Sequence, residues 1–242
     1  MGIPGELVVV PDVPAAFAQH TIDAFRNRPL DTFSLALSGG ATARRCYEHL
    51  AEVAGTQVDW WKVDVYWGDE RCVPHDDPDS NYRLAREALL DRVGAANATH
   101  LMRCAEGPDP YQLRLGDLGR FDLVHLGMGA DGHTASLFPE SAALDADPGR
   151  LVAMNDDPLG NNPHARMTLT FAGIARAALA LVTVTGEAKA PALAAIARGE
   201  DLPAARIASE RTIWLVDEAA ASLLEPAASR RPATRGAQNR AR

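Results

Sequence analysis

Residues 121–139 constrain the fold of this chain more than any other stretch of it. The segment opens with a short apolar run, and three glycines follow within six residues. Such a run indicates a buried strand, and glycines directly behind it allow positive φ angles and a close approach of a ligand to the backbone. Asp131 and His133 stand among these glycines. The segment therefore predicts a buried strand that ends in a functional site, with a helix beginning beside the histidine.

Apolar runs of strand length recur along the chain and alternate with segments of helical periodicity. This alternation predicts right-handed βαβ units and an α/β fold, with a mostly parallel sheet covered by helices on both faces. The predicted strands are 7–10, 33–37, 63–67, 123–126, a short strand near Leu151, 167–170, 180–184 and 213–216. The predicted helices follow Asp12, Thr42 and Ser80 (the last to about Val93), cover about 171–176, and follow Gly186 and Asp217.

Length and charge limit the number of domains and the kinds of partner. The 242 residues allow one large domain or two small ones, and we expect a single α/β domain over residues 1–225. The stretch 226–242 has no apolar periodicity and predicts a disordered basic tail. Because that tail carries five arginines and no acidic residue, the formal net charge of −8 becomes about −13 for the domain alone. This charge argues against nucleic acid as a partner, and a small anionic ligand would need a local cluster of cations.

The cysteines and the amino terminus indicate a compartment. The chain has three cysteines, Cys46, Cys72 and Cys104, and no CxxC spacing. An odd number without such spacing argues against a disulfide framework or a zinc site and is typical of a reducing compartment. The amino terminus lacks a basic segment followed by a long apolar one, and no apolar run approaches the length of a membrane span. We therefore expect a cytoplasmic protein with no membrane partner.

Four predicted strands each run into a segment that carries a glycine and reactive polar side chains. These strands end at Leu37, Trp67, Leu126 and Val184. In open α/β sheets, ligands bind outside the carboxyl ends of the strands, at the point where the strand order reverses. We therefore expect the four segments to line one crevice.

Residues 38–42 read Ser-Gly-Gly-Ala-Thr between a strand and a helix, an arrangement typical of an anion site. Backbone N–H groups at the start of the helix, together with two hydroxyls, suit a phosphate at the positive end of the helix dipole. The segment lacks the GxxxxGKS/T and GxGxxG patterns, so a nucleotide has no direct support, and an ordinary Ser/Gly turn is the alternative. Lys189, near the start of a later helix, and Arg166 are candidate cations, although either could be a solvated surface residue.

The remaining two segments carry candidates for catalysis. Asp69, Glu70 and Arg71 directly follow a buried strand, and Arg71 could pair with a carboxylate or stabilise a developing oxyanion. A solvated turn with local ion pairs is the alternative interpretation. His133 is the strongest candidate, because histidine is suited to proton transfer near neutral pH and Asp131 stands two residues away.

The other histidines show no such setting. His20, His49, His100 and His164 are interpreted as structural, and His125 alternates into a buried strand as a core histidine. No spacing of His, Cys and Asp resembles a metal site, so we expect neither a metal nor a cofactor.

Taken together, the four segments resemble those of the bacterial 6-phosphogluconolactonases. The resemblance lies in residues 38–42, 68–74 with 80–82, 127–139 and the pair Gly186 and Lys189, and it covers about 7–224. It implies a Rossmann-like fold shared with glucosamine-6-phosphate deaminases. It also implies metal-independent hydrolysis of 6-phospho-D-glucono-1,5-lactone to 6-phospho-D-gluconate, a step of the oxidative pentose phosphate pathway.

The resemblance also implies a role for each matching residue. His133 would act as general base on a water molecule. The side chains that would arrange the catalytic site are Asp131, Asp69, Glu70 and Arg71, and the residues that would hold the substrate phosphate are Ser38, Gly39, Gly40, Thr42, Arg166 and Lys189. The family often has Pro where this chain has Ala43, and its absence should loosen the phosphate loop without removing the anion site.

Two other functions stay open for such a chain. Glucosamine-6-phosphate deaminases tend to carry Asn-Glu-Pro shortly after the Gly-His segment, whereas residues 136–140 here read Ser-Leu-Phe-Pro-Glu. Asp-Glu-Arg also stands in place of the deaminase's Asp-Glu-Tyr. A non-catalytic sugar-phosphate sensor would keep the phosphate loop but would have no need of the Asp-Gly-His sequence at 131–133. The oligomeric state is left open between monomer and homodimer.

Overall fold

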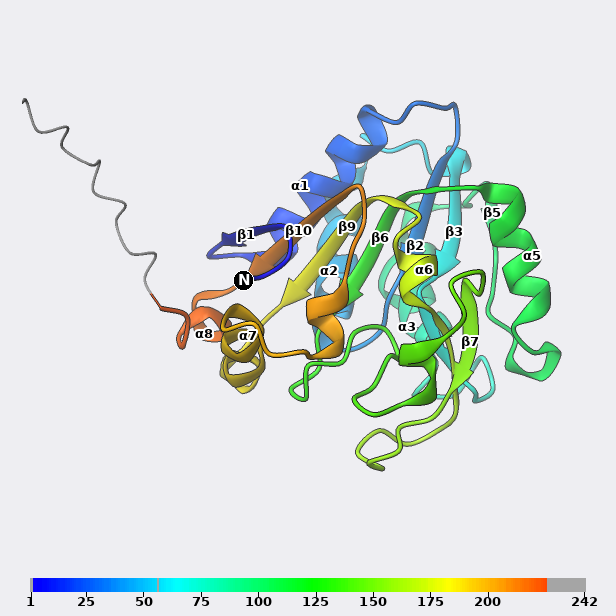
Figure 1. The fold of residues 1–242 in the computed structure, drawn as a ribbon. Coiled ribbons are helices and arrows are strands. Elements are labelled where there is room, and N and C mark those ends of the chain that lie inside the picture. Colours follow the sequence, from blue (N-terminus) through cyan, green and yellow to red (C-terminus); the bar gives the residue numbers. More distant parts are fainter. Residues whose placement is uncertain (1, 56, 226–242) are drawn as a thin grey trace, which may run out of the picture.

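The centre of the molecule is a seven-stranded sheet, which the computed structural model describes together with the rest of residues 2–55 and 57–225. The strand order is β1-β10-β9-β6-β2-β3-β5, and every neighbouring pair is parallel, as predicted (Figure 1). The tail expected to be disordered, residues 226–242, lies outside the described residues. The strands are β1 (Glu6–Val9), β2 (Phe33–Leu37), β3 (Val63–Trp67), β5 (Ala98–Thr99), β6 (Phe121–Gly127), β9 (Ala177–Val184) and β10 (Arg211–Val216).

Helices connect these strands and cover both faces of the sheet. Because parallel crossovers are right-handed, α1 and α2, which lead toward β3, lie on one face, whereas α5 and α7, which lead back toward β1, lie on the other. The helices are α1 (Val13–Arg26), α2 (Ala41–Ala54), α3 (Asn81–Ala85), α4 (Asp91–Val93), α5 (Asp109–Leu118), α6 (Phe171–Ile174), α7 (Ala190–Ala197) and α8 (Glu218–Ala221). Shorter helical turns are η1 (Trp60–Lys62), η2 (Arg86–Leu90), η3 (Cys104–Glu106), η4 (Ala142–Asp145), η5 (Glu187–Lys189) and η6 (Pro203–Arg206).

Most of the helical elements agree with the predicted ones. The helix predicted from Ser80 to about Val93 is confirmed, because α3, η2 and α4 follow one another without a gap and the Ser80 hydroxyl accepts the Arg83 N–H at 3.2 Å. Helix α5 is not among the predicted elements. Only Tyr111 and Leu115 of that helix are buried, so its apolar stripe is too thin to stand out in the sequence.

A second, antiparallel sheet has three strands in the order β4-β8-β7. These are β4 (Asp69–Arg71), β8 (Arg166–Leu169) and β7 (Val152–Asn155), and the last two match the predicted strands at 167–170 and near Leu151. Strand β4 was expected as a polar segment after a strand. Its three charged residues carry no strand pattern, and it becomes a strand only by pairing with β8, which is far away in the sequence.

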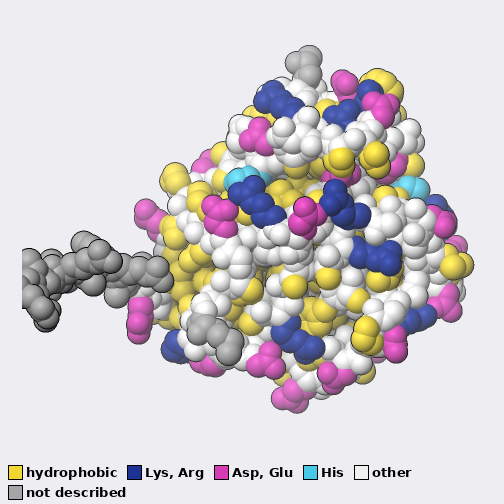
Figure 2. All heavy atoms as spheres, turned by 45° about the horizontal axis from the view of Figure 1, so that its top comes forward, with side chains coloured by type: hydrophobic (Ala, Val, Ile, Leu, Met, Phe, Trp, Pro, Cys, Tyr) yellow, Lys and Arg dark blue, Asp and Glu magenta, His cyan; other side chains and the backbone are white. Residues whose placement is uncertain are grey.

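The core is apolar, and the surface carries charged side chains of both signs (Figure 2). All five residues of β2 are buried, and Trp67, Trp214 and Tyr47 are among the largest fully buried side chains. On the face shown in Figure 2, Lys and Arg side chains are interspersed with Asp and Glu rather than gathered in one basic patch. Among the helices of residues 2–55 and 57–225, none has the length and apolar character needed to cross a membrane.

Candidate active site

A cavity of about 540 Å³ opens at the carboxyl ends of the central strands. Strands β2 and β6 are neighbours there, but the chain continues from β2 to β3 on one side and from β6 to β9 on the other, so the cavity lies at a switch point. All four predicted segments contribute to its wall, which confirms the common crevice. The predicted site residues on the wall are Ser38, Gly39, Gly40, Thr42, Asp69, Arg71, His133 and Lys189, whereas Asp131, Glu70 and Arg166 do not line it.

The amino-terminal end of α2 meets this cavity through residues 38–42. Gly40 occupies the N-cap position with φ +93°, and no described side chain caps the helix, so its first N–H groups are left for a ligand. Gly39 is required for packing, because a Cβ there would collide with the side chain of Asn81. This end of the cavity is therefore arranged for an anion.

A buried series of hydrogen bonds supports the Ser38 end of this loop. Tyr47 Oη accepts the Ser38 N–H at 2.6 Å and lies 3.2 Å from the Ser38 carbonyl oxygen. His125 Nδ1 lies 2.8 Å from the same hydroxyl, and His125 Nε2 lies 2.9 Å from Thr183 Oγ1. His125 has no exposed surface, which confirms its interpretation as a core histidine. Burial lowers the pKa of His125 to about 3, so the imidazole is neutral in the folded protein near neutral pH.

Acid should destabilise the protein through His125. In the unfolded chain its imidazole takes up a proton below the ordinary pKa of 6.5, whereas in the folded chain it stays neutral down to about pH 3. Stability that is present above pH 6.5 is therefore lost as the pH falls toward 3, by up to about 1.4 kcal/mol per pH unit. Urea unfolding between about pH 7 and about pH 4 should show a shallower decline for His125→Gln than for the wild type. The surface variant His49→Gln should keep the wild-type slope, and equal slopes for all three proteins would contradict this assignment.

His133 and Asp131 form a hydrogen-bonded pair at the end of β6. Asp131 Oδ1 lies 2.6 Å from His133 Nδ1 and also accepts the His133 backbone N–H at 3.2 Å. Partial burial acts to raise the pKa of Asp131, but the hydrogen bonds and the charge of His133 outweigh it, and the pKa is lowered. The carboxylate orients the imidazole through Nδ1, and Nε2 has no hydrogen-bond partner among the described residues. Because His133 lies on the cavity wall, this nitrogen is available to a ligand or a water molecule.

The helix expected to begin beside His133 is absent from the described residues, so that prediction is wrong. Gly132 has φ +80° and Ala135 has φ +47°, and neither angle continues a right-handed helix. Instead, the Gly129 N–H donates to the His133 carbonyl oxygen at 2.8 Å and closes a tight turn. A Cβ on Gly129 would collide with the side chains of both His133 and Asp131. The glycines of this segment therefore serve the turn that holds the pair.

Glu70 is buried and binds the backbone around β4. Its Oε1 accepts the N–H groups of Arg71 and Asn81, both at 2.7 Å. Its Oε2 accepts the Tyr82 N–H at 2.8 Å and the Ser80 hydroxyl at 3.2 Å. Burial raises the pKa of Glu70, and the three backbone N–H groups act against that shift. The carboxylate thus caps the start of α3 and orders the backbone of Arg71, and it does not line the cavity.

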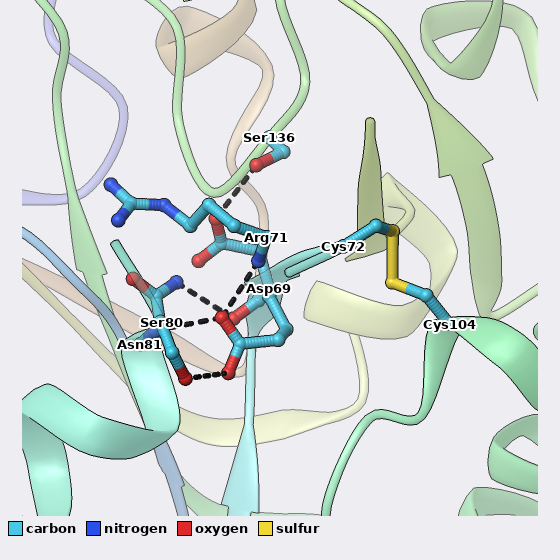
Figure 3. Close-up of a disulfide and its surroundings, with 8 residues drawn as sticks. Asp69, Arg71, Cys72, Ser80, Asn81, Cys104 and Ser136 are labelled. Carbon is cyan, nitrogen blue, oxygen red and sulfur yellow. Dashed lines mark hydrogen bonds between the residues drawn. A yellow bond between two sulfur atoms is a disulfide. The ribbon is translucent and has the colours of Figure 1, made fainter. Parts of the chain in front are cut away.

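Asp69 lines the cavity from the same strand. Its Oδ2 accepts the Ser136 hydroxyl at 2.7 Å (Figure 3). The Asn81 side chain donates to the Asp69 carbonyl oxygen at 2.9 Å, and its own Oδ1 is buried without a hydrogen-bond partner among the described residues. Asn81 also lines the cavity, so these two residues form one polar part of the wall.

Arg71 and Arg166 lie opposite one another in the pairing of β4 with β8. Arg71 lines the cavity, and its guanidinium donates to the carbonyl oxygen of Asp79. Arg166 is buried, and its Nη1 has no hydrogen-bond partner among the described residues. Burial lowers the pKa of Arg166, and the charge of Arg71 lowers it further. Arg71 is therefore placed for a ligand contact, whereas a contact of Arg166 with phosphate stays a prediction.

Lys189 lies directly before α7 and lines the cavity beside the loop at Gly186. Burial lowers the pKa of its ammonium group, and the charge of Asp131 acts against that shift. Asp217 holds the loop, because both of its carboxylate oxygens lie 3.0 Å from the Gly186 N–H. A cation at the amino end of a helix is opposed by the helix dipole, and a bound anion would compensate for it.

Cys72 and Cys104 form a disulfide with their Cα atoms 5.4 Å apart, so the expectation of no disulfide is wrong. Cys72 directly follows β4, and Figure 3 shows the disulfide on the side of this strand that faces away from the Arg71 guanidinium. The sequence could not reveal this pair, because 32 residues separate the two cysteines and only the fold brings them together. Cys46 is free and buried, and burial raises its pKa to about 12. Because two of the three cysteines form this bond, cysteine usage no longer indicates a reducing compartment.

The cavity wall also holds residues that sequence reasoning did not single out. Arg45 had a detectable signal, because it follows Thr42 by three residues, a spacing at which helix side chains share a face. In residues 2–55 and 57–225, no group of three or more His, Cys, Asp or Glu side chains could hold a metal ion. The additional wall residues include Arg45, Asn81, Asn162, Thr185 and Asp217.

Known proteins are similar to this chain in sequence and in fold. The family model of glucosamine-6-phosphate isomerases/6-phosphogluconolactonase matches residues 8–214. A 6-phosphogluconolactonase from Synechocystis sp. is 38% identical over 212 residues, covering 80% of this chain and 85% of that protein, and one from Nostoc sp. is 36% identical, covering 89% and 97%. The crystal structure of 6-phosphogluconolactonase from Leishmania guyanensis superposes with a TM-score of 0.80 at 25% identity, covering 92% of this chain and 99% of that one. This chain therefore belongs to the glucosamine-6-phosphate isomerase/6-phosphogluconolactonase family.

Proposed function

We propose that this chain hydrolyses 6-phospho-D-glucono-1,5-lactone to 6-phospho-D-gluconate, with His133 as the base that activates water. The observation that carries this proposal is the pair of His133 and Asp131 on a cavity that also receives the amino end of α2. The pair supplies acid–base chemistry, and the helix end supplies an anion site. The relatives from Synechocystis sp. and Nostoc sp., which match most of this chain, are 6-phosphogluconolactonases, and this supports the same assignment.

Hydrolysis of a lactone needs a base for water, donors for the tetrahedral oxyanion and an acid for the departing ring oxygen. His133 Nε2 takes a proton as the water oxygen bonds to the lactone carbonyl carbon. Asp131 stabilises the imidazolium that forms, and the guanidinium of Arg71 donates to the oxyanion. The bond to the ring oxygen then breaks, and His133 returns its proton to that oxygen. The base is regenerated, and water is the only co-reactant.

The substrate phosphate is bound away from the reacting carbonyl, by residues 38–42 and Lys189. Binding energy from this remote group holds the lactone against His133. Asp69 and Glu70 act through their neighbours, since Asp69 holds Ser136 and Glu70 orders the backbone of Arg71. The proposed steps need no metal or cofactor. A cytoplasmic location stays a prediction, and the oligomeric state stays open between monomer and homodimer.

The test is an assay of the purified protein with freshly generated 6-phosphogluconolactone, from which spontaneous hydrolysis is subtracted. The same protein should be tested for ammonia release from glucosamine 6-phosphate, because the family includes isomerases of that substrate. Ammonia release without lactone hydrolysis would overturn the proposal.

Lys189→Ala should raise KM for the phosphorylated lactone by about 10–100-fold, with a small effect on kcat. The ammonium group is partly buried on the cavity wall, and losing a charge-assisted contact to phosphate costs about 1.5–3 kcal/mol. Initial rates with the phosphorylated and the unphosphorylated lactone measure the effect, which should appear with the first substrate alone. Lys62→Ala is the matched control, because Lys62 is the other lysine of the chain and pairs with Asp31 at 2.7 Å. A wild-type KM in Lys189→Ala would show that this residue does not touch the phosphate.

A further inference from the structure

Arg45 extends from α2 toward the start of that helix. Helix side chains lean toward the amino terminus, and residues three apart share a face, so Arg45 reaches the level of Thr42. Its Nη2 donates to Thr185 Oγ1 at 2.8 Å, and the same hydroxyl oxygen lies 2.6 Å from Thr42 Oγ1. All three residues line the cavity. The guanidinium is thus held over the loop at residues 38–42 by a hydroxyl that also contacts the loop.

The charge of Arg45 is not balanced by an acidic side chain among the described residues. Its neighbour Arg44 pairs with Glu87 at 3.2 Å and with Glu48 at 3.8 Å, whereas Arg45 makes no salt bridge within residues 2–55 and 57–225. The first turn of α2 contains no acidic residue either. The helix dipole destabilises a cation near the amino end of a helix. A bound anion there would be stabilised by the dipole and by the charge of Arg45.

A guanidinium binds phosphate with a geometry that a lysine ammonium group lacks. Its planar N–H groups can donate two parallel hydrogen bonds to one phosphate, and it stays charged at every working pH. Lys189 contributes a single ammonium group from the start of α7. Arg45 comes from α2, which follows β2, whereas Lys189 precedes α7, which follows β9. Strand β6 lies between β2 and β9, so the two cations approach the anion site from different elements.

We propose that Arg45 is a further phosphate-binding residue, which donates to the substrate phosphate alongside the α2 amides and Lys189 and is aimed by Thr185. This inference rests on the proposed lactonase function and deepens it, because it makes Arg45 a determinant of selectivity for the phosphorylated lactone. Arg45 is exposed, so its contribution is screened by salt and is smaller than that of a buried contact.

The test compares Arg45→Ala with Arg44→Ala. The two arginines are neighbours on one helix, but only Arg45 lines the cavity. Arg45→Ala should raise KM for the phosphorylated lactone about tenfold and weaken calorimetric binding of 6-phosphogluconate by a similar factor. Its kcat and its activity on unphosphorylated gluconolactone should stay at the wild-type level. For Arg45→Lys, KM and the product affinity should lie between those of the wild type and those of Arg45→Ala, because lysine keeps the charge and lacks the planar N–H groups of the guanidinium. Arg44→Ala should behave as the wild type, and unchanged thermal unfolding of each variant shows that it folds.

Two results would overturn the inference. One is a wild-type KM and product affinity in Arg45→Ala. The other is an equal loss in Arg44→Ala, which would mean that only the general positive charge of this helix matters. Failure of the proposed function looks different, because the wild type itself would then not hydrolyse the lactone, while calorimetry of 6-phosphogluconate would still show whether Arg45 binds the phosphate.

Discussion

His133→Asn should lower kcat by about 10²–10⁴-fold and leave KM near the wild-type value. Asparagine keeps part of the size and polarity of the imidazole, but it has no basic nitrogen that could take the proton of water. KM should change little, because residues 38–42 and Lys189 form the anion end of the cavity and are untouched by the substitution. Initial rates over a range of substrate concentrations, corrected for spontaneous hydrolysis, measure both constants.

The pH dependence gives a second measure of the same role. In the wild type, kcat/KM should fall at acid pH, where a histidine base is protonated, and this decline should be absent from His133→Asn. The control His49→Asn, whose imidazole faces Glu52 at 3.7 Å on the surface of α2, should keep the wild-type profile. A corrected kcat for His133→Asn within a few-fold of the wild type would mean that another group activates water. Glu70 is unsuited to that task, because its oxygens already accept three backbone N–H groups, which leaves Asp69.

Breaking the disulfide between Cys72 and Cys104 should lower the free energy of unfolding by about 3–4 kcal/mol. The bond closes a loop across a sequence separation of 32 residues and so restricts the unfolded chain. For a domain of this size the loss corresponds to a fall in Tm of about 10 °C. Activity at room temperature should persist, because β4 is also paired with β8 and the Cys72 N–H donates to the Ala165 carbonyl oxygen at 2.9 Å.

Calorimetry of the wild type with and without a reductant measures this effect. The double variant Cys72→Ser/Cys104→Ser is the control, since its Tm should not respond to the reductant. Each single variant should lose as much stability as the double variant, because either substitution breaks the bond. Titration of the unfolded, unreduced wild type should find one thiol, that of Cys46. Three titratable thiols, or a Tm that ignores the reductant, would contradict the prediction.

The central sheet could be predicted from local sequence. The runs predicted at 33–37 and 63–67 coincide with β2 and β3, because a strand buried on both faces is apolar almost throughout and stands out against polar loops. The carboxyl ends of parallel strands meet at one edge of the sheet, so the polar segments behind them could be expected to share a crevice. Local patterns were enough to identify several residues of the cavity wall. These are Ser38, Gly39, Gly40, Thr42, Asp69, Arg71, His133 and Lys189.

What the sequence did not determine depends on pairs of residues that are far apart in the chain. Glu70 reads as a polar residue behind a strand, and only the folded chain places the N–H groups of Asn81 and Tyr82 around its carboxylate. The pairing of β4 with β8 and the bond between Cys72 and Cys104 join segments that carry no common periodicity. Hydrogen-bond partners, burial and covalent cross-links are properties of positions in space, so they exist only once tertiary packing has brought distant segments together.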